Sequence, residues 1–347
     1  MKNMENNLPF VSIVIPCRNE EKFIGKCLDS IIANNYPKDN LEILVIDGMS
    51  EDGTKKVVEG YSRQYPFIKY LENPKKITPC ALNIGIKEAK GGIVMRMDAH
   101  ATYKEDYVSK CIRYLNEYNA DNVGGVMMTL PMENTFTGKA IVIALSSRFG
   151  VGNSAFRTGS KEPKWVDTVF GGCYKKEVFE KIGLFNENLV STQDMEFNLR
   201  LKRAGGKILL HPDIISYYYT RSNLKDFCKN NFRNGFWAIY PIKFTKEMPV
   251  SLRHLVPLVF VFSLVFSLVT GMFAPTLIWL FFSIMGAYVA LCIYSSLVIA
   301  LREGNFFYLL MMPVVFTILH FLYGLGSLWA LFGLLSLKKK IVSSESK

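Results

Sequence analysis

Short apolar runs alternate with amphipathic segments over the first hundred residues of this chain. The runs are typical of strands buried on both faces and lie at residues 11–16, 41–46, 67–72 and 92–97. Between them, apolar positions recur with helical spacing at residues 21–34, 53–65 and 79–89. This βαβαβαβ order predicts an α/β fold, with a mostly parallel sheet covered by helices on both faces.

The next part of the chain, up to about residue 253, carries weaker signals. Helices are predicted at residues 106–118, 176–182 and 194–204, and strands at 122–130, 165–172, 207–210 and 214–219. Residues 132–163 are rich in Gly, Ser, Thr and Asn, which favours a loop with a helix. Residues 222–253 are basic and aromatic, which favours a partly helical segment along a membrane surface.

Charge almost disappears between residues 255 and 337, where Arg302 and Glu303 are the only formally charged side chains. Two apolar blocks, residues 255–273 and 276–301, are each long enough for a membrane span, which needs about 20 residues. A third block, residues 306–337, is too long for one straight span. Because it contains Pro313 and several glycines, it predicts either a kinked span or a re-entrant or interfacial segment followed by a span.

The formal net charge of +11 includes two basic clusters that border the apolar region. The first consists of Lys243, Lys246, Arg253 and His254, and the second of Lys338, Lys339 and Lys340. Both clusters are typical of the cytoplasmic face of a multi-pass membrane protein. Three spans would put them on opposite sides of the membrane. The sequence therefore favours two or four crossings, or two crossings plus a re-entrant piece.

The domain organisation follows from these shifts in composition. We expect a folded domain at residues 1–221, an interfacial segment at 222–254, a transmembrane region at 255–337 and a basic, polar tail at 338–347. The first ten residues contain no apolar region of the signal-peptide kind, so the folded domain is expected on the cytosolic side of the cytoplasmic membrane.

The 7 cysteines form no CxxC pair, which indicates neither a zinc site nor a disulfide framework. No long basic run or aromatic–basic repeat occurs, which argues against nucleic acid as a partner.

Acidic side chains follow two of the predicted strands and open one of the predicted helices. Asp47 and Asp98 each end a strand, where open α/β sheets bind ligands, and Asp194 and Glu196 lie in the first turn of a helix. Asp98 and His100 are on alternate positions of an expected extended segment, so both would point to the side where a hard divalent cation could neutralise a diphosphate. Structural roles remain open: a turn acid for Asp47, a non-metal role for the Asp-x-His pair, and N-terminal capping for Asp194.

The order and spacing of these motifs resemble glycosyltransferase family 2, inverting enzymes with a GT-A fold, over about residues 9–240. Residues 11–20 are similar to the opening strand and donor loop of that family. The other matching motifs are Asp47, Ala81-Leu82-Asn83 with Gly85, Asp98, Gly171-Gly172, Gln193-Asp194-Met195-Glu196 and Asn230-Asn231-Phe232-Arg233 with Gly235. The resemblance implies a Rossmann-like GT-A domain followed by transmembrane helices.

The resemblance also implies a role for each matched residue. Asp194 would be the catalytic base, Asp98 and His100 would hold Mg²⁺ or Mn²⁺, and Gly171, Gly172 and Glu196 would lie on the acceptor side. The implied donor-binding residues are Pro16, Arg18, Asn19, Glu20, Asp47, Asn83 and Arg233. Among these, Asp47 would bind the uracil of a UDP-sugar and Arg233 would face its diphosphate.

Three segments resemble one subgroup most, the membrane-anchored glucosyltransferases of succinoglycan-type exopolysaccharide assembly. These segments are Asp98-Ala99-His100-Ala101, Val166-Asp167-Thr168-Val169 and Phe232-Arg233-Asn234-Gly235. The chain departs from the family pattern at Arg18, His100, Gln193 and Asn230, where many members have an aromatic residue, an acid, a Glu and a Gln. His100 would either bind the metal as a neutral imidazole or contact the diphosphate.

The expected function is an inverting glycosyltransferase that acts on a polyprenyl-linked saccharide at the bilayer, using a nucleotide-sugar donor. One rival is an enzyme of the same fold that charges a polyprenyl phosphate directly. A processive polysaccharide synthase is less favoured because the Gln-x-x-Arg-Trp motif of such enzymes is incomplete here. A membrane-anchored binding protein without turnover is disfavoured by the presence of Asp47, Asp98, Asp194 and Arg233.

Overall fold

The computed structural model describes residues 8–245 and 250–345, without the side chains of residues 336–345. Lys246 of the first basic cluster and the side chains of Lys338, Lys339 and Lys340 therefore lie outside the described part. The chain divides into two compact units. The first comprises Met1–Met128 and Ala155–Tyr219, and the second comprises Thr129–Ser154 and Thr220–Lys347. The chain thus passes from one unit to the other three times.

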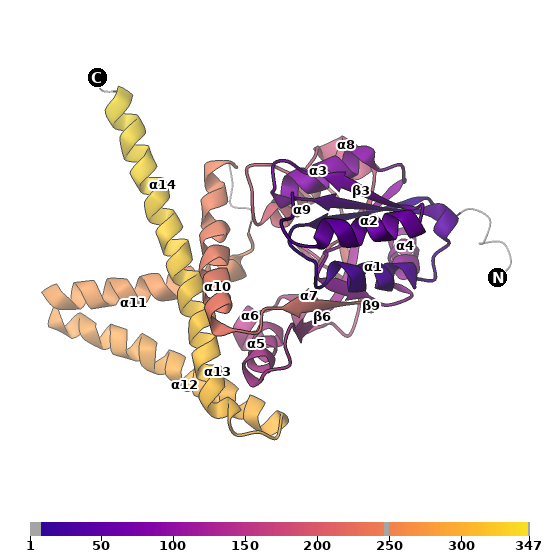
Figure 1. The fold of residues 1–347 in the computed structure, drawn as a ribbon. Coiled ribbons are helices and arrows are strands. Elements are labelled where there is room, and N and C mark those ends of the chain that lie inside the picture. The colour runs from indigo at the N-terminus through magenta and orange to yellow at the C-terminus, as the bar shows by residue number, and fades with distance from the viewer. Residues whose placement is uncertain (1–7, 246–249, 346–347) are drawn as a thin grey trace. The chain divides into compact units, whose positions relative to one another are not determined.

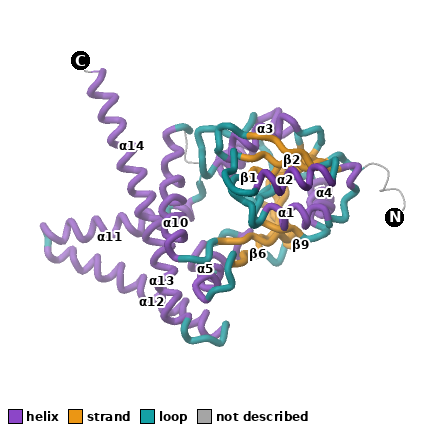
Figure 2. Tube along the Cα trace, viewed as in Figure 1, coloured by secondary structure: helices purple, strands orange, loops and turns teal. Residues whose placement is uncertain are grey.

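The first unit is built around a sheet whose first half is parallel (Figures 1 and 2). Its strands are β1 (Val11–Cys17), β2 (Leu41–Asp47), β3 (Ile68–Glu72) and β4 (Ile93–Arg96), in the order β3-β2-β1-β4. All three pairings in this half are parallel, and β1 and β2 are buried along almost their whole length. Continuous apolar runs are typical of such strands, so the sequence prediction is confirmed here.

The second half of the sheet is antiparallel where its pairings are described. It contains β8 (Cys173–Lys175), β6 (Asn122–Pro131), β9 (Ile208–Thr220) and β5 (Ala101–Tyr103), with β7 (Lys164–Trp165) paired to β9. The strand predicted at residues 165–172 is therefore wrong beyond Trp165. The two strands predicted at 207–210 and 214–219 form the single strand β9, which continues through Pro212 although proline lacks an N–H donor.

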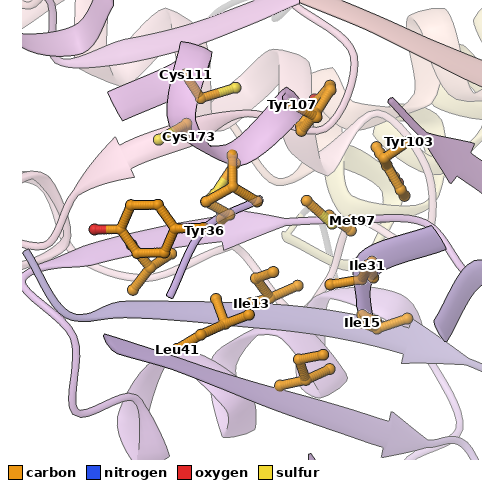
Figure 3. Close-up of a cluster of buried hydrophobic side chains, with 14 of the residues drawn as sticks. Ile13, Ile15, Ile31, Tyr36, Leu41, Met97, Tyr103, Tyr107, Cys111 and Cys173 are labelled. Atoms are coloured by element: carbon orange, nitrogen blue, oxygen red, sulfur yellow. The ribbon is translucent and has the colours of Figure 1, made fainter. Parts of the chain in front are cut away.

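Helices cover both faces of this sheet, as alternate residues of β1 show. Ile13 and Ile15 pack into one buried cluster with α1 (Ile24–Ile32), α2 (Thr54–Gln64) and α4 (Tyr107–Glu117), part of which Figure 3 shows. Val14 packs into a second cluster with α3 (Thr78–Glu88), α8 (Glu177–Ile182) and α9 (Gln193–Arg203). The period-two alternation of a strand accounts for this division.

The second unit contains three helical stretches that are long and apolar enough to cross a membrane: Leu252–Phe273, Pro275–Arg302 and Tyr308–Leu335. They contain α11 (Val256–Phe273), α12 (Ile278–Arg302), and α13 (Tyr308–Thr317) followed by α14 (Tyr323–Glu345). A π-helical turn at Ile318–Leu322 joins α13 to α14, so the third block is helical throughout, with Pro313 inside α13. The number of crossings stays a prediction.

Residues 129–154 belong to this second unit rather than to the sheet domain. They contain α5 (Phe136–Ser146) and α6 (Arg148–Val151), and Ala140, Ile141 and Ala144 of α5 are buried in one cluster with residues of α12 and α13. His320 in the π-helical turn contacts the Phe149 carbonyl through Nε2, at 3.0 Å. A helix was expected in this region, and its packing against the apolar helices was not.

The remaining helix of the second unit, α10 (Leu224–Ile239), packs closely on α14 through small residues. A Cβ added to Gly326 would lie 2.1 Å from the Phe232 carbonyl oxygen, and one added to Gly235 would lie 1.9 Å from the Tyr323 carbonyl oxygen. The Ser327 hydroxyl donates to the Gly235 carbonyl at 2.9 Å. Small residues allow such close approach between helix backbones, as they do in membrane proteins.

Candidate active site

Asp47 ends β2 and is almost completely buried, with 1% of its surface exposed. The parallel register places it beside Cys17, the last residue of β1. Its carboxylate accepts hydrogen bonds from the Ser50 hydroxyl, from the Ser50 N–H at 3.2 Å and from the Tyr70 hydroxyl at 3.0 Å. Burial first, and then the hydrogen bond to Asp47, raise the pKa of Tyr70 above its usual value, so Tyr70 stays a donor.

The loops that follow β1 and β2 hold each other in place. The Asn19 N–H donates to the Ser50 hydroxyl at 2.8 Å, and the Asn19 side-chain oxygen accepts from the Glu51 N–H at 2.9 Å. Asn19 itself has a positive φ of 55°, a conformation that Asn tolerates better than most residues. The Glu20 N–H donates to the Thr54 hydroxyl at 2.8 Å. The structure therefore brings Asn19 and Glu20 next to the Asp47 loop, as a shared donor site requires.

Three other predicted donor-binding residues make no described hydrogen bond to Asp47 or to its loop. Pro16 lies inside β1 and is partly exposed. Arg18 is exposed and its Nη2 lies 3.7 Å from Glu51 Oε1. The Asn83 amide is engaged with the Phe185 backbone, which it contacts twice at 2.9 Å. These contacts give Asn83 a structural function in joining α3 to residue 185, and its role toward a donor stays a prediction.

Asp98 and His100 follow β4 in a turn that the Ala101 N–H closes onto the Asp98 carbonyl at 3.2 Å. The expected extended conformation is therefore wrong, and the two side chains take different partners. His100 Nδ1 lies 3.0 Å from Glu20 Oε1, and the imidazole packs edge-on against Tyr218 with 4.9 Å between ring centroids. Burial alone would lower the pKa of His100, but Tyr218 and Glu20 outweigh it and raise the pKa to about 10. In this arrangement the imidazole is protonated at neutral pH.

Arg96 is a candidate site residue that the sequence analysis did not identify. It is the last residue of β4, its side chain is 13% exposed, and it lies between two of the predicted site acids. Its Nη2 is 3.3 Å from Asp98 Oδ1, and its Nη1 is 4.0 Å from Asp194 Oδ2. Burial would lower its pKa, but the charges of Asp98 and Asp194 raise it further above neutrality. A charged residue inside the run Ile93-Val94-Met95-Arg96-Met97 was the signal available in the sequence.

Asp194 lies in the first turn of α9, where its carboxylate accepts the Met195 N–H at 2.9 Å. Its side chain is 34% exposed, compared with 17% for Asp98, the other acid that pairs with Arg96. Glu196 is held differently: both of its oxygens accept from Arg200, at 2.6 and 2.9 Å. Asp194 is thus the acid of this turn that remains open to an acceptor, and the acceptor-side role of Glu196 stays a prediction.

The turn at Gly171-Gly172 packs directly on the backbone of Arg96. Both glycines have positive φ, 69° and 119°. The Arg96 N–H donates to the Gly172 carbonyl at 2.9 Å, and a Cβ added to Gly171 would lie 2.7 Å from the Arg96 carbonyl oxygen. A Cβ added to Gly172 would lie 2.6 Å from the Tyr174 ring. Glycine is therefore required at both positions, and the turn fixes the strand that carries Arg96.

Arg233 lies on α10 in the second unit, where its Nη2 donates to the Asn230 side-chain oxygen at 3.0 Å. Its role toward a diphosphate stays a prediction. Within residues 8–245 and 250–345, no group of three or more His, Cys, Asp or Glu side chains is arranged to hold a metal ion. Any metal at Asp98 would therefore need further ligands such as water or a bound substrate.

Comparisons with known proteins identify a matching family model and similar chains. A family model described as Glycosyl transferase family 2 matches residues 12–183. The dolichyl N-acetyl-alpha-D-glucosaminyl phosphate 3-beta-D-2,3-diacetamido-2,3-dideoxy-beta-D-glucuronosyltransferase of Methanococcus voltae is 35% identical over 271 residues, which cover 76% of this chain and 82% of that protein. The succinoglycan biosynthesis protein ExoA of Rhizobium meliloti is 28% identical over 295 residues, 84% of this chain and 86% of that protein.

One solved structure has a similar fold along most of the chain. It is the mannosyltransferase PcManGT from Pyrobaculum calidifontis, determined in complex with GDP-Man and Mn²⁺. The two chains superpose with a TM-score of 0.59 at 17% identity, over 93% of this chain and 88% of the other. At this identity the likeness establishes the fold alone.

Proposed function

We propose that this chain, which belongs to glycosyl transferase family 2 and is a glycosyltransferase, moves a sugar from a nucleotide-diphosphate donor to a hydroxyl of a lipid-linked saccharide. The observation that carries the proposal is the position of Arg96 between Asp98 and Asp194. In this arrangement, an acid that could hold a metal and an acid that could act as a base flank one largely buried cation. The name of the Methanococcus relative, which describes transfer to a dolichyl-linked sugar phosphate, supports the acceptor class, and so does the relative from succinoglycan biosynthesis.

The donor nucleoside would be bound by Asp47 and the two loops around it. The Asp47 carboxylate can accept a hydrogen bond from a base N–H or a ribose hydroxyl, and Asn19 and Glu20 lie in the loop tied to Ser50 and Thr54. A UDP-sugar is the donor that the resemblance implies. Because Asp47 already accepts from the Ser50 hydroxyl, the nucleoside would replace one of these hydrogen bonds rather than meet an unpaired carboxylate.

The donor diphosphate would be neutralised at Asp98. The residues fit a divalent cation such as Mg²⁺ or Mn²⁺, because the Asp98 carboxylate is partly exposed and such ions prefer carboxylate oxygens. The ion would compete for Asp98 with the Arg96 guanidinium, which lies 3.3 Å away. A hard cation shared between one carboxylate and the substrate phosphates is the usual arrangement for Mg²⁺ in such sites. When bound, the ion would make the nucleoside diphosphate a better leaving group. His100, protonated and held by Glu20, is better suited to contact the diphosphate than to bind the metal.

Asp194 would act as the general base. Its carboxylate takes the proton from the acceptor hydroxyl as that oxygen attacks the anomeric carbon. The bond between the anomeric carbon and the diphosphate breaks on the opposite face, so the configuration inverts in one displacement. Arg96 keeps the Asp194 carboxylate oriented during this step, and no covalent enzyme intermediate is needed.

The decisive test is Asp194→Asn in the full-length protein purified in detergent. We expect transfer from UDP- or GDP-sugars to a lipid-linked saccharide extract to be lost, while binding of the nucleotide with Mn²⁺ stays measurable by calorimetry. The substitution keeps the shape and the bond from the Met195 N–H but removes the base. Normal turnover by this variant would contradict the role of Asp194.

The acceptor class needs a separate measurement with the wild-type protein. Sugar-loaded polyprenyl carrier should accept the sugar, and bare polyprenyl phosphate should not. Preference for the bare carrier would overturn the acceptor class while leaving the transferase activity intact. Absence of both transfer and donor hydrolysis, with every donor and with Mn²⁺ present, would contradict the proposed function itself.

A further inference from the structure

Arg157 is a partly buried cation for which the described part of the chain provides no hydrogen bond and no ion pair. It lies on the short helix α7 (Ala155–Thr158) of the first unit. Its Nη1 is shut off from solvent and has no partner within residues 8–245 and 250–345. Leaving a buried N–H donor of a charged group without a hydrogen bond is unfavourable. Such an arrangement persists where function requires it.

The surroundings of Arg157 are aromatic rather than acidic. Its guanidinium lies over the Phe156 ring, 5.4 Å from the centroid, and close enough to Tyr218 for the two groups to interact electrostatically. Phe156 packs against the buried cluster under α9, the helix that carries Asp194. The flat guanidinium is therefore fixed in direction while its hydrogen-bond donors remain unused.

Tyr218 connects Arg157 to the site described above. The Tyr218 ring packs against His100 at 4.9 Å and against Phe170 at 5.5 Å. In the pairing of β5 with β9, Tyr218 is also the partner of Ala101, three residues after Asp98. Tyr218 thus contacts His100 in that turn and also lies within electrostatic range of Arg157.

We propose that Arg157 binds a phosphate group of a substrate, near the turn that carries Asp98 and His100. This inference rests on the proposed function, in which both substrates carry phosphate: the nucleotide-diphosphate donor and the phosphate-bearing lipid carrier. A guanidinium presents paired N–H donors that match phosphate oxygens. A bound phosphate would supply the negative charge that no described side chain supplies to Arg157. Two sources of this phosphate are distinguishable by experiment.

The test uses Arg157→Gln and Arg157→Lys in the full-length protein in detergent. The probes are UDP and GDP with Mn²⁺, compared with uridine and guanosine, and polyprenyl phosphate in mixed micelles, compared with polyprenol. We expect Arg157→Gln to weaken binding of one phosphate probe by about 10- to 100-fold, the usual effect of losing hydrogen bonds to a charged group. Binding of the matching phosphate-free probe should not change, and Arg157→Lys should weaken binding less.

The affected probe identifies the source of the phosphate: a nucleotide effect assigns Arg157 to the donor, and a polyprenyl phosphate effect assigns it to the carrier. If Arg157→Gln binds every phosphate probe as the wild type does, the inference is wrong. If the wild type binds none of the phosphate probes, the proposed function fails and the inference fails with it. The two failures are therefore distinct.

A second measurement separates ligand binding from a structural role. Without ligand, Arg157→Gln should melt at the same temperature as the wild type or higher, because Arg157 makes no hydrogen bond or ion pair within the described residues that the substitution could remove. Arg200→Gln is the matched stability control: Arg200 is paired with Glu196 and donates to the Ile182 and Leu184 carbonyls, so its loss should lower the melting temperature. A lower melting temperature for Arg157→Gln together with unchanged phosphate binding would overturn the proposal.

Discussion

Replacing Arg96 by Met should strengthen metal binding and weaken catalysis at the same time. Arg96 and a divalent metal ion would share one carboxylate, Asp98, whose Oδ1 is 3.3 Å from Arg96 Nη2. Methionine has a similar length and no charge, so the substitution removes the competing cation without creating a large cavity. Asp194 loses the same partner, 4.0 Å away, and with it the group that orients the base.

The size of the effect follows from the distance and the exposure. A pair of unit charges at 3.3 Å attracts by about 1 kcal/mol in water and about 5 kcal/mol at an effective dielectric constant of 20. The two side chains are 13% and 17% exposed, so the real value lies between these limits. Even the lower limit corresponds to about a tenfold change in affinity. We therefore expect the dissociation constant for Mn²⁺ to fall by about tenfold or more, and kcat to fall by about 100-fold through the misplaced base.

The assay has two readouts on the same purified protein. Titration of Mn²⁺ by electron paramagnetic resonance gives the metal affinity, and a transfer assay at saturating Mn²⁺ gives kcat. Arg96→Lys is the matched control, because it keeps the positive charge and should hold the Mn²⁺ affinity near that of the wild type. If Arg96→Met folds and binds Mn²⁺ no more tightly than the wild type does, Arg96 and the metal do not share Asp98.

Two other substitutions test separate parts of the site. The pKa of His100 is raised to about 10 in the folded protein, so its contribution to stability is complete below the unfolded pKa of about 6.5 and is lost as the pH rises through 10. The melting temperature of the wild type should therefore fall toward that of His100→Gln as the pH rises over this range. A difference in melting temperature that stays constant with pH would exclude the ion pair with Glu20. Gly172→Ala forces a side chain into φ 119° and against Tyr174, so it should destabilise the fold by about 1–3 kcal/mol in denaturant titration. Gly60→Ala, in α2 with open space around it, should be neutral or stabilising by about 1 kcal/mol; equal effects of the two substitutions would refute the steric argument.

The parallel half of the sheet could be predicted because its signals are local. The apolar run at residues 41–46 is observed as β2 (Leu41–Asp47), and the helical periodicity at residues 79–89 is observed as α3 (Thr78–Glu88). Burial on both faces demands a continuous apolar run, and such a run has few other structures available to it. The segment at residues 165–172 had a similar composition, yet only its first residue is in a strand, because the Gly-Gly turn and Arg96 determine its path.

The positions of the candidate acids in the fold could be predicted from the sequence because these acids lie at the ends of regular elements. Asp47 and Asp98 follow strands, and Asp194 begins a helix, so their positions follow from the fold. The partners of these acids could not be found in that way. Glu20 meets His100 from 80 residues away, and Arg96 acquires its importance only when α9 places Asp194 near it. Both contacts depend on packing between elements, which periodicity does not encode.

The threefold passage of the chain between its two units has a consequence for biosynthesis. Helix α5 buries Ala140, Ile141 and Ala144 in one cluster with α12 and α13, but α13 begins at Tyr308, about 160 residues after α5 ends. At the usual rate of synthesis, α5 would wait on the order of ten to thirty seconds for this partner. During that interval its apolar face needs another surface, and the bilayer interface offers one. We therefore expect a nascent chain stalled before Leu252, where the first candidate span begins, to be found on membranes rather than in the soluble fraction. Helix α5, which interrupts the sequence of the sheet domain, would hold it there.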